Sequence, residues 1–213
     1  METYRAAPPD NAVILFNGSD ADNWSTRAGQ PAGWKVEDDI LHVVPGTGDI
    51  VSRERFGDFF LHLEFRCPHM PEATGQARGN SGVFLQGRYE IQVLDSHGID
   101  IPGMGDCGAI YNQFAPLVNA SKPPLEWQTY DVIFRAPRLQ GGQVEEGVRL
   151  SVLHNGVAIH NNIQLPGVTG AAFDEEVGEP GPLLLQDHGN LVAYRNIWTV
   201  PLPLEGSDTY EPR

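Results

Sequence analysis

One stretch of the chain decides the fold: Asn80-Ser-Gly-Val-Phe-Leu-Gln-Gly-Arg-Tyr-Glu-Ile-Gln-Val-Leu-Asp95. It divides at Gly87 into two segments, and apolar and polar residues alternate in the second. Side chains of a β-strand point alternately to the two faces of its sheet. The apolar residues around Ile91 therefore predict a buried face, whereas Glu90 and Gln92 predict a polar face. A polar sheet face of this kind suits ligands with many hydroxyl groups.

The same period of two recurs along the chain. Further segments of this type lie at 59–66, 130–135, 148–154, 157–159, 183–188 and 191–200. Asn155-Gly156 between two of them is a strong hairpin signal, and Gly189-Asn190 predicts a hairpin that joins the last two. No segment shows a sustained helical period. Many short strands with one apolar face predict an all-β fold, a two-sheet antiparallel jelly-roll sandwich.

The length of 213 residues predicts one domain, which we place at 11–203 between terminal tails at 1–10 and 204–213. Three long connections interrupt the strands, at 67–79, 96–126 and 161–180. Long loops in a compact domain are usually functional. The middle one carries Tyr111 and is predicted to form a wall over a site.

Charge and cysteine content exclude several classes of protein. The net charge of −14 repels phosphate backbones, so we expect no nucleic-acid partner. No apolar run is long enough to cross a bilayer, and the first residues lack the pattern of a signal peptide, so we expect a cytoplasmic protein. Cys67 and Cys107 form neither a disulfide scaffold nor a zinc pair. Two reduced thiols fit that compartment, although the sequence leaves their pairing open.

By the alternation of side chains, several polar residues fall on the polar face of their predicted strands. They are Glu64, Arg66, Glu90, Gln92, Gln186, His188 and Arg195. We predict that they surround one concave cavity. Histidine exchanges protons readily near neutral pH, so His188 is the predicted proton shuttle. Glu90 is the predicted base or metal ligand, Glu64 the second catalytic carboxylate, and Asn80 a substrate-binding residue at a strand start.

The sequence leaves the need for a divalent cation open. Glu64, Glu90 and His188 together would supply oxygen and nitrogen ligands. No His-x-His or His-x-x-x-His spacing demands a metal. His62 shares the predicted face of Glu64, but we expect it to be an exposed strand histidine.

Short segments in a fixed order carry a resemblance to a known family. They include Leu15-Phe-Asn-Gly18, Asp58-Phe-Phe-Leu-His-Leu-Glu-Phe-Arg66, Asn80-Ser-Gly-Val83, Tyr89-Glu-Ile-Gln-Val-Leu-Asp95, Gly108-Ala-Ile-Tyr111, Glu126-Trp-Gln-Thr-Tyr130, Leu185-Gln-Asp-His-Gly189 and Arg195-Asn-Ile-Trp198. In these segments the chain resembles the 3-keto-disaccharide hydrolase family, which has a concanavalin A-like sandwich. Asp39 and Gln128 depart from the Gly and Asn that such sequences usually carry.

The resemblance implies an enzyme that cleaves glycosides whose C3 hydroxyl has been oxidised to a ketone. Such a ketone acidifies the C2 proton, so a base can form an enolate and expel the C1 substituent. Addition of water would make the net reaction a hydrolysis, and the sequence leaves hydrolysis and elimination open. The route needs a base, an acid and donors at the ketone oxygen. It also implies a sugar 3-oxidoreductase as the pathway partner.

Two alternatives remain open at this stage. Glu90-x-Gln92-x-x-Asp95 has the spacing of a retaining glycosidase of jelly-roll type, which needs two carboxyl groups about 5–5.5 Å apart. A non-catalytic carbohydrate-binding module is the other alternative. Such modules often display an aromatic platform, whereas Trp34, Trp127 and Trp198 are predicted to lie in the core or at strand ends.

Overall fold

The alternating segments form a series of antiparallel strands in a computed structural model that describes residues 6–204. Their bounds in chain order are β1 Val13–Phe16, β2 Trp24–Thr26, β3 Lys35–Glu37, β4 Ile40–His42, β5 Ile50–Phe56, β6 Phe59–Arg66, β7 Ser81–Leu85, β8 Tyr89–Val93, β9 Gln128–Arg135, β10 Arg138–Gln140, β11 Gln143–Glu146, β12 Arg149–His154, β13 Val157–Gln164, β14 Gly181–Leu185 and β15 Ala193–Pro201. One short 3₁₀ helix, η1, spans Gly75–Ala77. Of the predicted tails at 1–10 and 204–213, residues 1–5 and 205–213 lie outside the described residues.

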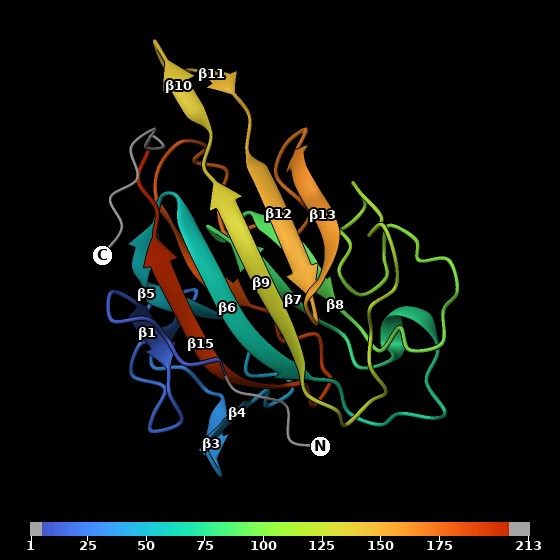
Figure 1. Ribbon diagram of the computed structural model, residues 1–213. Coiled ribbons are helices and arrows are strands. Elements are labelled where there is room, and N and C mark those ends of the chain that lie inside the picture. Colours follow the sequence, from blue (N-terminus) through green and yellow to red (C-terminus); the bar gives the residue numbers. More distant parts are fainter. Residues whose placement is uncertain (1–5, 205–213) are drawn as a thin grey trace.

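Most strands pair into two sheets that pack face to face (Figure 1). The eight-stranded sheet has the order β13-β12-β9-β6-β15-β4-β3, with β1 also paired to β15. The five-stranded sheet has the order β2-β5-β14-β7-β8, and β10 and β11 form a separate ribbon. The predicted two-sheet antiparallel sandwich is therefore confirmed.

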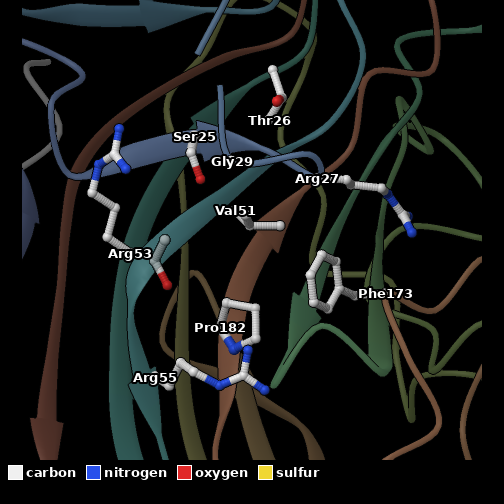
Figure 2. Close-up of a pocket in the computed structure, with 10 residues that line it drawn as sticks. Ser25, Thr26, Arg27, Gly29, Val51, Arg53, Arg55, Phe173 and Pro182 are labelled. Atoms are coloured by element: carbon white, nitrogen blue, oxygen red, sulfur yellow. The ribbon is translucent and has the colours of Figure 1, made fainter. Parts of the chain in front are cut away.

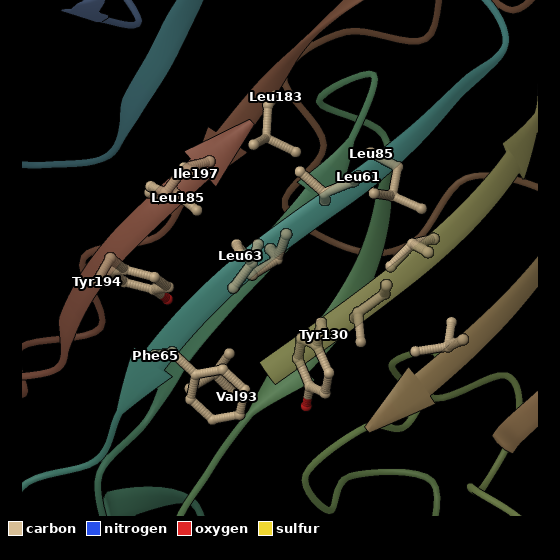
Figure 3. Packing of buried hydrophobic residues seen from close by; sticks show 14 of the residues in the cluster. Leu61, Leu63, Phe65, Leu85, Val93, Tyr130, Leu183, Leu185, Tyr194 and Ile197 are labelled. Carbon is tan, nitrogen blue, oxygen red and sulfur yellow. The ribbon is translucent and has the colours of Figure 1, made fainter. Parts of the chain in front are cut away.

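Apolar side chains from both sheets meet in the core between them (Figure 3). On β6, Leu61, Leu63 and Phe65 are fully buried there, and on β8 Ile91 and Val93 are fully buried. Because successive side chains alternate, the residues between them point away from the core. The polar rows of β6 and β8 therefore lie on opposite outer faces of the sandwich.

The structure confirms one predicted hairpin and corrects another. Asn155 and Gly156 have positive φ angles of 53° and 79° and join β12 to β13 in a tight turn. The hairpin predicted around Gly189-Asn190 is wrong, because β14 pairs with β5 and β7 whereas β15 pairs with β6 in the other sheet. All five residues of β14 are buried, so this strand lacks the polar face that would have indicated its sheet.

The connection from 96 to 126 adds an edge to the five-stranded sheet. The backbone N–H of Gln92 donates to the carbonyl of Ala109 at 2.9 Å, and Gly108 donates back to Gln92 at 2.9 Å. The predicted wall loop therefore continues the sheet beyond β8. Within residues 6–204, no helix has the length and apolar character needed to cross a membrane.

Candidate functional site

The predicted site residues do not share one cavity. Glu64 and Arg66 lie on β6 and Arg195 on β15, in the eight-stranded sheet. Glu90 and Gln92 lie on β8 of the five-stranded sheet, on the other side of the core. The prediction of a single cavity is wrong, because parity tells which residues point outward but does not tell to which sheet a strand belongs.

On the eight-stranded sheet, the Glu64 carboxylate is fully buried and fully paired. Arg195 Nε donates to its Oε2 at 2.6 Å, and Asn196 Nδ2 donates to its Oε1 at 3.0 Å. Burial alone would raise the pKa of Glu64, but His62, Asn196 and Arg195 outweigh burial and lower it. Glu64 is therefore a stably ionised partner in a structural network.

His62 lies in the same network. The expectation of an exposed histidine is wrong, since its side chain is buried beside Trp198, with ring centroids 5.0 Å apart. Its Nδ1 lies 2.7 Å from Asp131 Oδ1, and its Nε2 lies 3.9 Å from Glu64 Oε1. Burial alone would lower the pKa of His62, but the two carboxylates raise it to about 9. The ring is therefore a cation held between two anions.

Trp127 completes this outer face. The guanidinium of Arg195 lies 4.1 Å from the centre of its ring, and that of Arg66 lies 4.8 Å from it. Such contacts stabilise a cation over an aromatic face. We call the residues His62, Glu64, Arg66, Trp127, Asp131, Arg195 and Asn196 the paired cluster.

On the outer face of the five-stranded sheet, Gly82 has no side chain, and the Glu90 carboxyl fills the space that one would take. A Cβ atom at this position would clash with Oε1 of Glu90 and would lie 2.9 Å from the ring of Phe84. The Glu90 carboxyl therefore leans over bare backbone. Gln92 is the direct cross-strand partner of Gly82, and the backbone N–H of Gln186 donates to the Gly82 carbonyl at 3.0 Å.

Three buried amide oxygens on residues that neighbour Gly82 have no hydrogen-bond donor among the described residues. They are Asn80 Oδ1, Gln92 Oε1 and Gln186 Oε1. A buried polar atom without a partner costs about 1–3 kcal/mol, so such atoms are rare unless a ligand or water satisfies them. We call Asn80, Gly82, Glu90, Gln92 and Gln186 the open cluster.

Gln76, which sequence reasoning missed, orients two of these amides. Its Oε1 accepts hydrogen bonds from Gln92 Nε2 at 2.8 Å and from Asn80 Nδ2 at 3.2 Å. Its own Nε2 donates to the carbonyl of Gly105 at 2.8 Å. Since Gln76 lies in the short 3₁₀ helix η1, within a connection that shows no strand periodicity, no pattern in the sequence indicated this role.

The Glu90 carboxyl has an unusual electrostatic environment. Glu90 is only 4% exposed, and no described residue donates a hydrogen bond to its carboxyl oxygens. Burial, together with the negative charge of Asp49, raises its pKa to about 8. Arg27 Nε donates a hydrogen bond to Oδ2 of this Asp49 at 2.8 Å. At neutral pH, Glu90 is therefore mostly protonated and can donate a proton.

His188 and Tyr111 lie on segments of the chain that adjoin the open cluster. His188 is exposed in the loop that follows β14. This loop is fixed beside β7, because Asn80 N donates to Asn190 Oδ1 at 2.8 Å. Tyr111 is half-buried, and its backbone N–H donates to the Glu90 carbonyl at 3.2 Å.

The predicted metal-ligand set is also corrected. Glu64 lies on the opposite outer face from Glu90, so these two carboxylates cannot hold one ion with His188. Across residues 6–204, no three His, Cys, Asp or Glu side chains are grouped to hold a metal. Cys67 and Cys107 are both free and buried.

Asp95, the acid that a retaining glycosidase would pair with Glu90, is engaged by other groups. The regular pairing of β8 with β7 ends at Val93, before Asp95. Asp95 instead lies beside Arg78, with 3.4 Å between Oδ2 and Nε, and accepts the backbone N–H of His97 at 3.2 Å.

Comparisons with known proteins cover nearly the whole chain. The family described as the 3-keto-alpha-glucoside-1,2-lyase-like domain matches residues 11–199. A solved structure of a candidate glycosyl hydrolase from Parabacteroides distasonis ATCC 8503 shares 35% identity, with a TM-score of 0.84 over 94% of each chain. No curated protein matches.

Two further solved structures show the fold alone. A second candidate glycosyl hydrolase from Parabacteroides distasonis ATCC 8503 is 21% identical, with a TM-score of 0.67 over 91% of this chain and 95% of that one. A carbohydrate-binding module from Bacillus subtilis is 13% identical, with a TM-score of 0.50 over 84% of this chain and 95% of that one.

Proposed function

The chain belongs to the 3-keto-alpha-glucoside-1,2-lyase-like family, and we propose that it cleaves glycosides that carry a ketone at C3 of the sugar. It is a carbohydrate-active protein related to glycosyl hydrolases. The observation that carries the finer proposal is Glu90, a buried carboxyl with a pKa raised to about 8 and with no hydrogen-bond donor among the described residues. Near it are three buried amide oxygens that lack a hydrogen-bond donor among the described residues, those of Asn80, Gln92 and Gln186.

The open cluster matches the donors of a sugar. Hydroxyl groups would donate to Asn80 Oδ1, Gln92 Oε1 and Gln186 Oε1, which satisfies all three buried acceptors. The Glu90 carboxyl occupies the space over Gly82, so a sugar bound here would contact this carboxyl directly. Binding in this place would also exclude water from Glu90 and keep its carboxyl protonated.

The proposed reaction begins with removal of the C2 proton. The neighbouring ketone stabilises the resulting enolate, and His188, in the loop that follows β14, is the proposed base. The electrons of the enolate then form the C1–C2 double bond while the bond from C1 to the glycosidic oxygen breaks. Glu90 donates its proton to that oxygen, so the products are an unsaturated keto-sugar and a neutral alcohol.

Hydrolysis requires one further step with the same two groups. Water adds to C1 of the unsaturated sugar, Glu90 takes a proton from this water, and C2 is protonated. The sum is glycoside plus water giving keto-sugar plus alcohol. The ketone itself must come from an oxidoreductase that acts at C3, which is the proposed pathway partner.

This proposal is tested by comparing the cleavage of a chromogenic 3-keto-glucoside with that of its unoxidised parent glucoside. We expect release of the chromophore from the keto-glucoside alone, with and without a chelator. Reaction in deuterium oxide should place deuterium at C2 of the released keto-sugar. Rapid cleavage of the parent without deuterium at C2 would favour a conventional glycosidase, and binding of both sugars without turnover would favour a binding module.

A further inference from the structure

A second feature of the five-stranded sheet lies on the same outer face as Glu90. It is a hollow of about 290 Å³ over β2, β5 and β14, shown in Figure 2. Arg27, Arg53 and Arg55 line it together with Phe173 and Pro182. In a chain with a net charge of −14, three guanidinium groups around one hollow form a local positive region.

Arg53 keeps both terminal nitrogens available for a ligand, whereas Nη2 of Arg55 also lies 3.8 Å from Oδ2 of Asp174. Arg53 and Arg55 are two residues apart on β5, so they project from the same face. Each uses its Nε for a backbone carbonyl, Arg53 for Asp22 and Arg55 for Pro180, both at 2.8 Å. Within residues 6–204 the terminal nitrogens of Arg53 donate no hydrogen bond.

The third arginine, Arg27, connects the hollow to the open cluster. Its Nη2 lies 2.8 Å from Oδ2 of Asp49, the same carboxylate whose charge raises the pKa of Glu90. Arg27 also donates to the carbonyls of Ala171 at 2.7 Å and Ala172 at 3.0 Å, and so holds the loop that carries Phe173. Its charge is therefore largely satisfied within the protein.

Strand register gives the separation of the hollow from Glu90. Val51 at the hollow pairs with Leu184, Leu184 with Phe84, and Phe84 with Glu90. Three strand spacings correspond to about 14 Å. Phe173 packs on this apolar row and also lines the hollow. Because Leu184 and Phe84 are fully buried, a leaving group that extends from Glu90 to the hollow would pass over Phe173.

We propose that the hollow is the subsite for the leaving group, and that it selects leaving groups bearing a carboxylate or a sulfate. The inference rests on the proposed cleavage of 3-keto-glycosides. Arginine binds such oxyanions with paired N–H groups in a planar fork. Phe173 and Pro182 supply apolar contacts for the hydrocarbon part that carries the anion.

The test compares charged and neutral leaving groups. The substrates are the 3-keto-glucosides of 4-hydroxybenzoate, of its methyl ester, and of 4-hydroxyphenyl sulfate. The measured quantity is the ratio of kcat/KM for each anionic substrate to that for the methyl ester. In Arg53→Gln/Arg55→Gln we expect this ratio to fall about 10-fold, which corresponds to about 1.4 kcal/mol.

A matched control separates local contact from long-range charge. Lys35→Gln/Arg149→Gln removes the same two charges from the eight-stranded sheet, and its ratios should equal those of the wild type. A fall with one anion identifies that anion as the selected one. Unchanged ratios in Arg53→Gln/Arg55→Gln, or an equal fall in the control, would overturn the proposal.

A separate binding experiment distinguishes failure of this inference from failure of the proposed function. If wild-type protein cleaves none of the substrates, the proposed function fails, and 4-hydroxybenzoate alone is then titrated by NMR. Binding that is lost in Arg53→Gln/Arg55→Gln but kept in the control would support the anion site. Equal binding in all three proteins, or none in the wild type, would reject it.

Discussion

The two outer faces of the sandwich carry similar residues in opposite states. In the paired cluster, Glu64 is ionised and receives hydrogen bonds from Arg195 and Asn196, while His62 is a cation between two carboxylates. In the open cluster, Glu90 has no donor among the described residues and lies near a like charge. Burial alone does not distinguish them, since both carboxyls are buried. The difference lies at the carboxyl groups. The protein supplies hydrogen-bond donors to Glu64 but none to Glu90, although His62 Nε2 in the paired cluster also lacks a partner among the described residues.

The largest effect should come from removing the proton of Glu90. Glu90→Gln keeps the size of the side chain but cannot transfer a proton, so turnover of a 3-keto-glucoside should fall about 10²–10⁴-fold. The control is Glu54→Gln, which removes one carboxyl from an exposed position on β5, and its turnover should equal that of the wild type. Activity of Glu90→Gln within threefold of the wild type would contradict the assignment.

The paired cluster should respond in stability. Glu64→Gln leaves the Arg195 guanidinium and the His62 ring without their buried counter-charge. Breaking a buried ion pair from one side costs about 3–5 kcal/mol. Urea unfolding measures this loss, and turnover per folded molecule should stay close to the wild type. A stable variant with abolished turnover would move the active site to this face.

Adding a side chain at Gly82 should have an intermediate effect on activity. Gly82→Ala places a methyl group against the Glu90 carboxyl and must displace it, so kcat/KM should fall roughly 10–100-fold. Gly57→Ala is the control, because its Cβ would meet no atom within 4 Å. Circular dichroism should show the same fold in both variants. Equal activity of the two variants would show that the space over Gly82 is not used.

The smallest effect is a pH dependence of stability. The pKa of Glu90 in the folded protein is about 8, above its ordinary value of 4.5. Its contribution to stability is therefore fully present below pH 4.5 and is lost as the pH rises through 8. Compared with the wild type, Glu90→Gln should gain roughly 5 °C in Tm at pH 9 relative to pH 5. A Tm difference that does not change with pH would mean that Glu90 titrates normally.

Periodicity predicted the strands and the outward-facing rows, but it did not predict the sheet to which each row belongs. Glu64 and Glu90 obey the same alternation, and only the pairing partners of β6 and β8 separate them. The buried strand β14 hid the crossing between sheets, because it has no polar face. Asp49 and Gln76 come from connections between strands, where no periodic pattern marks a side chain that acts through a distant strand.

A crystal structure of Glu90→Gln with a bound 3-keto-glucoside tests the central claim most directly. We expect the sugar over Gly82 on the five-stranded sheet, with its hydroxyl groups within hydrogen-bond distance of Asn80, Gln92 and Gln186. The residue at position 90 should lie beside the glycosidic oxygen. A sugar bound instead on the opposite face, against Trp127, would contradict the claim that the face with Glu90 and the three unsatisfied amide oxygens is the active one.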